Sequence, residues 1–304
     1  MKFYIGMRLL LAALTSAVML WLLLEAPPAL KATWIWNTRL IVQERVEILS
    51  FAAQHGINRI YLHIEQTGIP LQAYRDFIRE ARASNIQVDA LGGDPSWSRL
   101  SKQKSVASFV DWVHAYNRSV SEEERFSGIH VDIEPHVHPL WKEDREQLKK
   151  EWLANLEWVI RETKKEPGME VSADIPFWMH QLSASESESV SAWLLRELDH
   201  VTLMAYRDAV AGRNGVLDIT SRILEEAGHA RQKVVIGLNI RDSGEGDHTT
   251  FYEEPPQELR EELLLLERRM KKYPAYAGFA IHDYEHWKQK IKREWEEPAA
   301  RERG

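Results

Sequence analysis

The sequence predicts an α/β protein of the (β/α)8 barrel class, also called a TIM barrel, with one domain behind an N-terminal hydrophobic segment. Short runs rich in β-branched and aromatic residues alternate with longer amphipathic stretches from Thr33 onward. Eight such pairs fit, and their strict alternation requires parallel strands joined by crossover helices. The remaining 272 residues are close to the roughly 250 typical of such barrels. The first expected strand, 33–37, is followed by Thr38 and not by a glycine-rich phosphate turn, which disfavours a doubly wound open sheet.

The first 32 residues have the pattern of an export signal. Lys2 and Arg8 precede residues 9–24, an apolar run that is polar only at Thr15 and Ser16. This length lies between a signal-peptide core and the roughly 20 residues of a spanning helix, and neither Ala26 nor Ala32 ends a clean cleavage site. We therefore expect residues 1–32 to be a signal peptide or an uncleaved membrane anchor, with the body secreted or tethered outside the cytoplasm.

The elements of the barrel are expected in a regular order over residues 33–297. The predicted strands are 33–37, 58–65, 86–91, 128–134, 169–175, 200–206, 233–239 and 276–283. Helical spacing of apolar residues is clear over 71–82 and 106–120. A last charged helix is expected over 288–297, followed by a frayed tail at 298–304.

Composition excludes several functions. After the N-terminal segment the chain has 36 basic and 45 acidic residues, a net charge of −9. A nucleic-acid partner is not expected, because binding phosphates requires a basic surface. The absence of cysteine excludes thiolate nucleophiles and thiolate metal sites. No feature of the sequence implies a cofactor, and none indicates an oligomeric state.

The fourth predicted strand carries the residues with the clearest chemistry. With a period of two, Ile129, Val131 and Ile133 face the helices, whereas His130, Asp132 and Glu134 point into the barrel. Ionisable groups on an interior face are costly unless a network or a ligand satisfies them. Glu134 comes last, at the carboxyl end where such barrels keep their catalytic groups. Burial and a neighbouring carboxylate raise the pKa of a glutamate, as a general acid requires.

Other polar side chains are expected at the same end of the barrel, together with tryptophans in the long loops. The same phase analysis brings these residues to the carboxyl end: His63, Glu65, Asp174, Tyr206, Asn239, His282 and Tyr284. The loops after the third, fourth and fifth strands each contain one tryptophan, namely Trp97, Trp141 and Trp178. Indole rings stack on the flat C–H faces of sugars, so the set predicts a site for a polyhydroxylated ligand.

Two stretches resemble glycoside hydrolase family 18, the chitinase-like barrels. Residues 127–134 are similar to the family's DxxDxDxE signature, and residues 201–206 to its MxY motif, with Met204 and Tyr206 in place. Strand 276–283 is similar to the family's closing strand in position and glycine placement. The resemblance implies that Glu134 is the acid/base, that Asp132 stabilises the substrate's N-acetyl group as internal nucleophile, and that Tyr206 holds this acetamide.

The chain departs from the signature at its first two aspartates. They are Ser127 and His130 here, so the carboxylate that shares a proton with Asp132 in the family is absent. A histidine at this place is expected to donate to Asp132 and hold it ionised. Strand 200–206 is followed by Arg207 rather than by the family's aspartate.

Three alternatives remain open. A two-carboxylate mechanism would pair Glu134 with Glu65, Asp174 or Glu245, and the carboxyl separation would then decide between retention and inversion. A metal-dependent hydrolase would use a cluster made of these residues: His130, Asp132, Glu134, His136 and His138. A barrel without activity would bind glycan only.

The sequence therefore predicts an exported glycoside hydrolase-like barrel that acts on a polysaccharide of the cell envelope or extracellular matrix. Glu134, Asp132 and Tyr206 are the expected catalytic residues. The expected substrate-binding residues are His130, Asp174, Trp178, Asn239, Glu65, Trp97, Trp141 and Tyr284. The expected partners are a polysaccharide or oligosaccharide and, if the first segment is uncleaved, a membrane.

Overall fold

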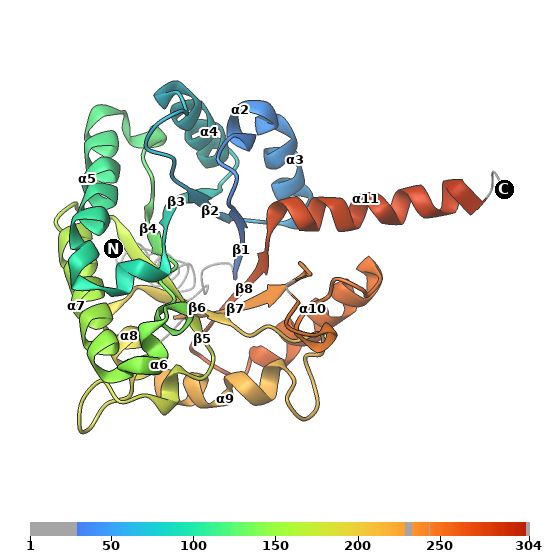
Figure 1. The fold of residues 1–304 in the computed structure, drawn as a ribbon. Coiled ribbons are helices and arrows are strands. Elements are labelled where there is room, and N and C mark those ends of the chain that lie inside the picture. The colour runs from blue at the N-terminus through green and yellow to red at the C-terminus, as the bar shows by residue number, and fades with distance from the viewer. Residues whose placement is uncertain (1–28, 229–232, 243, 302–304) are drawn as a thin grey trace, which may run out of the picture.

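Eight parallel strands close into one barrel in the order β1 to β8 (Figure 1). The structure is a computed structural model that describes residues 29–228, 233–242 and 244–301. The strands are β1 (Leu30–Ile35), β2 (Arg59–His63), β3 (Gln87–Gly92), β4 (Gly128–Val131), β5 (Glu170–Pro176), β6 (His200–Met204), β7 (Val234–Asn239) and β8 (Tyr276–His282). Each neighbouring pair is parallel, including β1 with β8. The predicted barrel is confirmed, and the doubly wound sheet is excluded.

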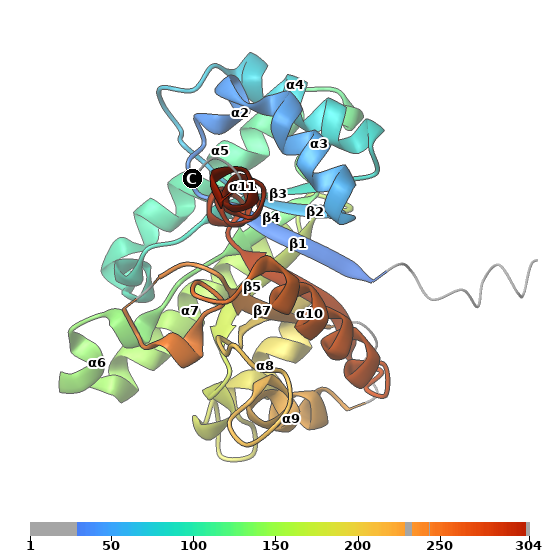
Figure 2. The same ribbon diagram turned by 90° about the vertical axis from the view of Figure 1, so that its right-hand side faces the viewer.

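Helices surround the barrel on its outside. They are α2 (Leu40–Gln43), α3 (Arg45–His55), α4 (Leu71–Ala83), α5 (Gln103–Ser119), α6 (Leu140–Glu143), α7 (Arg145–Thr163), α8 (Val190–Glu197), α9 (Val216–Ala227), α10 (Pro256–Met270) and α11 (Tyr284–Arg301). Short 3-10 turns η1 (Pro95–Ser98), η4 (Pro135–Val137) and η5 (Met179–Gln181) occupy the loops after β3, β4 and β5. The last helix, α11, extends outward from the barrel and is seen end-on in Figure 2.

Three predicted boundaries need correction. Strand β1 begins at Leu30, three residues before the predicted start, because Leu30 pairs with Gly278 of β8 and Ala32 with Arg59 of β2. Strand β4 ends at Val131, although Asp132 N still donates to Gly92 O at 3.0 Å. Helix α11 begins at Tyr284 and continues to Arg301, into the segment predicted as a tail.

Two apolar cores lie on the two sides of the barrel wall. The larger core fills the space between strands and helices, and it contains Ile129 and Val131 of β4 together with Ile133. The smaller core lies inside the barrel and includes Trp34 and Tyr61. The predicted alternation along β4 is therefore confirmed, and His130, Asp132 and Glu134 lie on the interior side.

The predicted export segment falls almost entirely outside the described residues, which begin at residue 29. Within the part of the chain that the structure describes, no helix is both long and apolar enough to cross a membrane.

Candidate active site

Glu134 lies at the carboxyl end of the barrel, directly after β4 and before the turn η4. About 30% of its side chain is exposed, and its Oε2 lies 3.2 Å from His136 Nε2. Burial lowers the pKa of His136, so this imidazole is neutral near pH 7 and orients the carboxyl group through one nitrogen. Glu134 is thus both held in place and accessible to a ligand.

The environment of Glu134 favours its protonated form. Burial raises the pKa of this carboxyl group to about 7, and the charges of Asp174 and Glu245 add to the effect. A general acid works best with a pKa near the operating pH, because it must hold a proton and still release it. The pKa of Glu134 is therefore raised, as predicted. The charges that contribute are those of Asp174 on β5 and Glu245 in the loop after β7.

The end of β4 is positioned by a close backbone contact with the loop after β3. A Cβ atom on Gly93 would lie 1.9 Å from the carbonyl oxygen of Asp132, a distance that no side chain can adopt. Glycine therefore allows the two chain segments to pass, and this contact fixes where Asp132 and Glu134 leave the strand.

His130 lies next to Asp174 rather than next to Asp132. Its Nε2 is 3.0 Å from Asp174 Oδ2, without the alignment of a hydrogen bond, and its Nδ1 is 2.7 Å from Ser172 Oγ. Burial lowers the pKa of His130 to about 3, so the ring is neutral. The expectation that His130 holds Asp132 ionised is therefore wrong: the ring packs deeper in the barrel, stacked on Tyr61 at 3.7 Å between ring centres.

Asp132, which is half-buried, and Asp174, which is buried, form a carboxyl pair next to Glu134. Burial raises the pKa of Asp132 well above its usual value, and the charges of Asp174 and Glu134 raise it further. Burial also raises the pKa of Asp174, although Trp34 Nε1 donates a 2.9 Å hydrogen bond to its Oδ2. Trp34 and Asp174 are 140 residues apart, and closure of the barrel brings them together.

Tyr206 lies on the other side of the same acidic group. Its ring stacks with that of His282 at 6.0 Å, and Trp36 Nε1 donates a 3.0 Å hydrogen bond to His282 Nε2. Burial raises the pKa of Tyr206, and the charges of Asp174 and Asp132 raise it further. The phenol therefore keeps its proton and can donate it in a hydrogen bond to an acetamide or hydroxyl oxygen.

Two tryptophans next to this group were missed by the sequence analysis. Trp34 and Trp36 alternate along the first strand, so the same period-two argument used for β4 places them on its interior side. That signal was present in the sequence, but no ionisable residue drew attention to it.

Two of the three predicted sugar-stacking tryptophans lie together near Glu134. The rings of Trp141 and Trp178 are 6.1 Å apart, and Trp178 contacts the edge of His136 at 5.4 Å. Both indoles are half-buried, which leaves surface for a ligand. A row of rings therefore leads away from Glu134 over η4, η5 and α6.

Of the four other predicted site residues, two pack in the outer core and two remain at the carboxyl end of the barrel. Tyr284 is a correction: it begins α11 and packs on Phe51 in the outer core, because β8 ends at His282 and the chain turns away from the barrel. Trp97 packs on Phe109 of α5. Both ends of the Asn239 amide bond the backbone of Arg241. Glu65 has its backbone bonded to Tyr74 Oη, and its Oε2 lies over Gly68.

The structure does not support the metal alternative. No group of three or more histidine or acidic residues in the described ranges is arranged to hold a metal ion. His130 is turned toward Asp174, and His138 Nδ1 accepts the backbone N–H of Leu140. The residues that would form the cluster therefore point to different partners.

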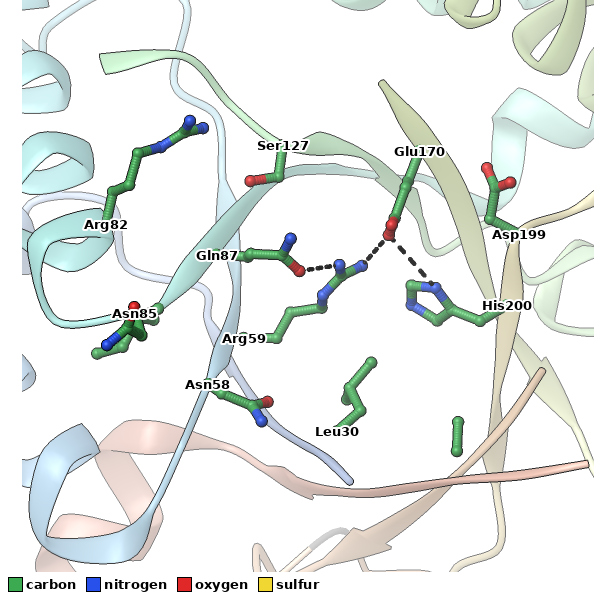
Figure 3. A pocket seen from close by; sticks show the side chains of 12 residues that line it. Leu30, Asn58, Arg59, Arg82, Asn85, Gln87, Ser127, Glu170, Asp199 and His200 are labelled. Atoms are coloured by element: carbon green, nitrogen blue, oxygen red, sulfur yellow. Dashed lines mark hydrogen bonds and ion pairs between the residues drawn. The ribbon is translucent and has the colours of Figure 1, made fainter. Parts of the chain in front are cut away.

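A hollow of about 600 Å³ lies at the end of the barrel opposite to Glu134 (Figure 3). Residues near the beginnings of the strands line it, among them Arg59, Glu170 and His200. Arg59 already pairs with Asp89 and Glu170, at 3.0 and 2.6 Å. Polar groups at this end of a (β/α)8 barrel usually serve stability, so the candidate active site is the end that holds Glu134.

The fold is similar to the (β/α)8 barrels of glycoside hydrolase family 18 chitinases. The sequence matches no family model and no curated protein. Among solved structures it is similar to a GH18 chitinase from Pseudoalteromonas aurantia, at 11% identity and a TM-score of 0.54 over 87% of this chain and 99% of that one. A chitinase from Bacteroides thetaiotaomicron matches at 12% identity and a TM-score of 0.54 over 85% and 90%. A GH18 chitinase from Cycas revoluta, in complex with (GlcNAc)3, matches at 15% identity and a TM-score of 0.51 over 85% and 96%.

Proposed function

We propose that this protein is a glycoside hydrolase that cleaves a polysaccharide containing N-acetylhexosamine, with Glu134 as the general acid/base. The observation that carries the proposal is the partly exposed Glu134, whose pKa is about 7, at the carboxyl end of a chitinase-like barrel. The similar chitinase from Cycas revoluta, which binds (GlcNAc)3, supports an N-acetylglucosamine polymer as the class of substrate.

The residues suggest how the bond would break. Glu134 gives its proton to the glycosidic oxygen, the C–O bond breaks, and the substrate's acetamide oxygen forms a bond to the anomeric carbon. Water then attacks this carbon, loses a proton to the Glu134 carboxylate and releases the hemiacetal, which restores both groups. Asp132 stabilises the positive charge on the acetamide, and Tyr206 orients it through a hydrogen bond.

The first prediction tests this role of Glu134. The full chain is incubated with N-acetylglucosamine oligosaccharides and with a panel of envelope and matrix glycans, and the products are separated by mass. Glu134→Gln removes the transferable proton with little change in shape. Turnover is expected to fall by about 10²–10⁴-fold while glycan affinity is retained.

Glu143→Gln serves as the matched control. Glu143 is an exposed glutamate on α6 at the same end of the barrel, and its variant is expected to turn over like the wild type. Unchanged turnover of Glu134→Gln on a cleaved glycan would contradict the proposal.

A glycan-binding barrel without activity is the second candidate. It is favoured by His130 at a signature aspartate and by the raised pKa of Asp132, which opposes the negative charge that would stabilise an acetamide cation. Binding of a glycan with no product from either wild type or Glu134→Gln would support this candidate.

The place of action is also proposed to be outside the cytoplasm, on an envelope or matrix polysaccharide. This proposal is supported by the basic residues before the apolar run of residues 9–24.

A further inference from the structure

The carboxyl groups of Asp132 and Asp174 come from neighbouring strands at equal register. Strands β4 and β5 pair Gly128 with Glu170 and Val131 with Ala173, so the next step along both strands sets Asp132 beside Asp174. Neighbouring strands lie about 4.8 Å apart. The 2.7 Å contact between His130 and Ser172, one pair earlier on the same face, shows that side chains at this register meet inside the barrel.

Each of the two carboxyl groups has one oxygen without a hydrogen-bond partner. Asp132 Oδ1 and Asp174 Oδ1 are both buried and unpaired among the described residues, whereas Asp174 Oδ2 accepts from Trp34. In the described part of the chain, the only basic side chain within ion-pair distance of either group is the neutral His130. A buried and a half-buried carboxylate side by side without a cation are not expected to be ionised together, because like charges at close range repel strongly.

We propose that Asp132 and Asp174 share one proton between their unpaired oxygens, so that Asp174 supplies from β5 the carboxyl partner that His130 replaces on β4. Trp34 and His130 then act as positioning residues, since they hold the other oxygen of Asp174 in place. Sharing a proton leaves one negative charge on the pair, which is the charge an acetamide cation needs beneath it.

Other titratable groups also face the pair. They are Tyr61 of β2, His130 of β4, Glu134 after β4 and Tyr206 after β6. Tyr61 and Tyr206 have raised pKa values and His130 a lowered one, so all three are neutral near pH 7. Glu134 is the one member of this set that titrates near neutrality, at about 7.

The test measures the protonation of the pair without any substrate. The full chain is labelled with ¹³C at the aspartate side-chain carboxyl, and the two signals are followed by NMR from pH 3 to 9. Asp132→Asn and Asp174→Asn assign the signals, and a Glu134→Gln background removes the nearby titration. In the parent chain both carbons are expected to respond to the same two titration steps, as coupled groups do.

The single variants distinguish a shared proton from simple burial. In Asp174→Asn an amide N–H takes the place of the shared proton, so the carboxyl of Asp132 is expected to titrate at lower pH than the upper step of the pair. The reciprocal result is expected for Asp174 in Asp132→Asn, which gives a second reading if one variant does not fold. If the remaining carboxyl keeps the upper step in either folded variant, burial alone explains its pKa and the proposal is overturned.

Asp89→Asn is the matched control. Asp89 is fully buried inside the barrel but pairs with Arg59 at the other end. Its variant is expected to leave both titration steps of the pair unchanged. A change in those steps would show a general effect of charge in the barrel and would contradict a proton held by two residues.

The catalytic meaning of the pair rests on the proposed function, but the shared proton does not. On any cleaved glycan, Asp174→Asn is expected to lower kcat more than it raises KM and to move the pH profile, whereas a purely structural role would not move it. A coupled titration without turnover would reject the hydrolase and keep the pair. Turnover with independent titrations would reject the shared proton and keep the hydrolase.

Discussion

Glu134 shows how the surroundings of a glutamate change the pKa of its carboxyl group. Burial moves its pKa to about 7, and two acidic neighbours, Asp174 and Glu245, favour the protonated form. The surface glutamate Glu146 has a lowered pKa instead, because Lys149 donates a hydrogen bond to it. The pKa of a glutamate in this protein is therefore raised or lowered according to its burial and its neighbours.

The pH dependence of activity tests this account at the residue scale. In the proposed mechanism the protonated form of Glu134 is the active acid, so kcat/KM is expected to decline as pH rises through about 7. The negative charge of Glu245 raises the pKa of Glu134, so Glu245→Gln lowers it and moves the decline to lower pH.

Glu253→Gln, an exposed change in the same loop, provides the comparison, and its profile is expected to match the wild type. A decline that stays in place in Glu245→Gln, or moves to higher pH, would contradict the assigned charge effect.

The two ends of the barrel strands hold different groups of residues: the candidate active site at one end and an ion-pair network at the other. The carboxyl ends of β4 and β5 place Glu134, Asp132 and Asp174 together, whereas residues near the beginnings of β2, β3 and β5 hold a compensated ion-pair network. Figure 3 shows its pair of Arg59 with Glu170. Arg59 is the centre of that network, and its partner Asp89 is fully buried. Stability therefore depends on the end of the barrel that the proposed chemistry does not use.

Replacement of Arg59 tests this division at the element scale. Arg59→Met leaves the Asp89 carboxyl buried without its cation, and the free energy of unfolding is expected to fall by about 3–5 kcal/mol in denaturant titrations. Burial raises the folded-state pKa of Asp89, and loss of the arginine raises it further. The defect is therefore expected to grow as pH rises from about 4, the unfolded value, through the folded pKa, and to shrink in acid.

Glu170→Gln is the control for this measurement. The side chain of Glu170 is 41% exposed, and its loss leaves Arg59 paired with Asp89, so a much smaller effect is expected. Equal losses of stability in the two variants would show that the depth of Asp89 does not matter.

At the scale of the whole molecule, the start of the described chain and the candidate active site lie at opposite ends of the barrel. The described part enters the barrel at Leu30, at the beginning of β1, and Glu134 lies at the far end of the strands. Any tether through the preceding residues would attach at the end away from the candidate site, and would leave that site directed away from the membrane.

Export is the prediction that belongs to this scale. A full-length chain with a C-terminal tag, produced in bacterial cells, is expected to lose the tag when protease is added to spheroplasts. This expectation follows from the proposed orientation, in which the basic residues before the apolar run stay inside and the body lies outside the inner membrane. A variant without residues 9–24 is expected to stay protected. A protected tag in the full-length chain would contradict export.

Local sequence patterns were enough to predict the barrel architecture and two residues of the candidate site, Asp132 and Glu134. Alternation of strands and helices was enough for the eight-stranded barrel, and period-two phasing in β4 identified Asp132 and Glu134, because both patterns depend on neighbours within a few residues. The boundaries at Leu30 and Tyr284 were missed, since they depend on pairing with strands and on packing against helices that are distant in sequence.

Closure of the barrel decided the rest. The contacts of Asp174 with Trp34 and His130 join residues 140 and 44 positions apart, and the register of β4 against β5 sets which carboxyl group meets Asp132. A sequence pattern shows on which face of a strand a side chain lies, but only the relative alignment of strands fixes its partner across the barrel. The pKa of a buried group depends on that partner and on burial, so the chemistry of the site was decided by the tertiary structure.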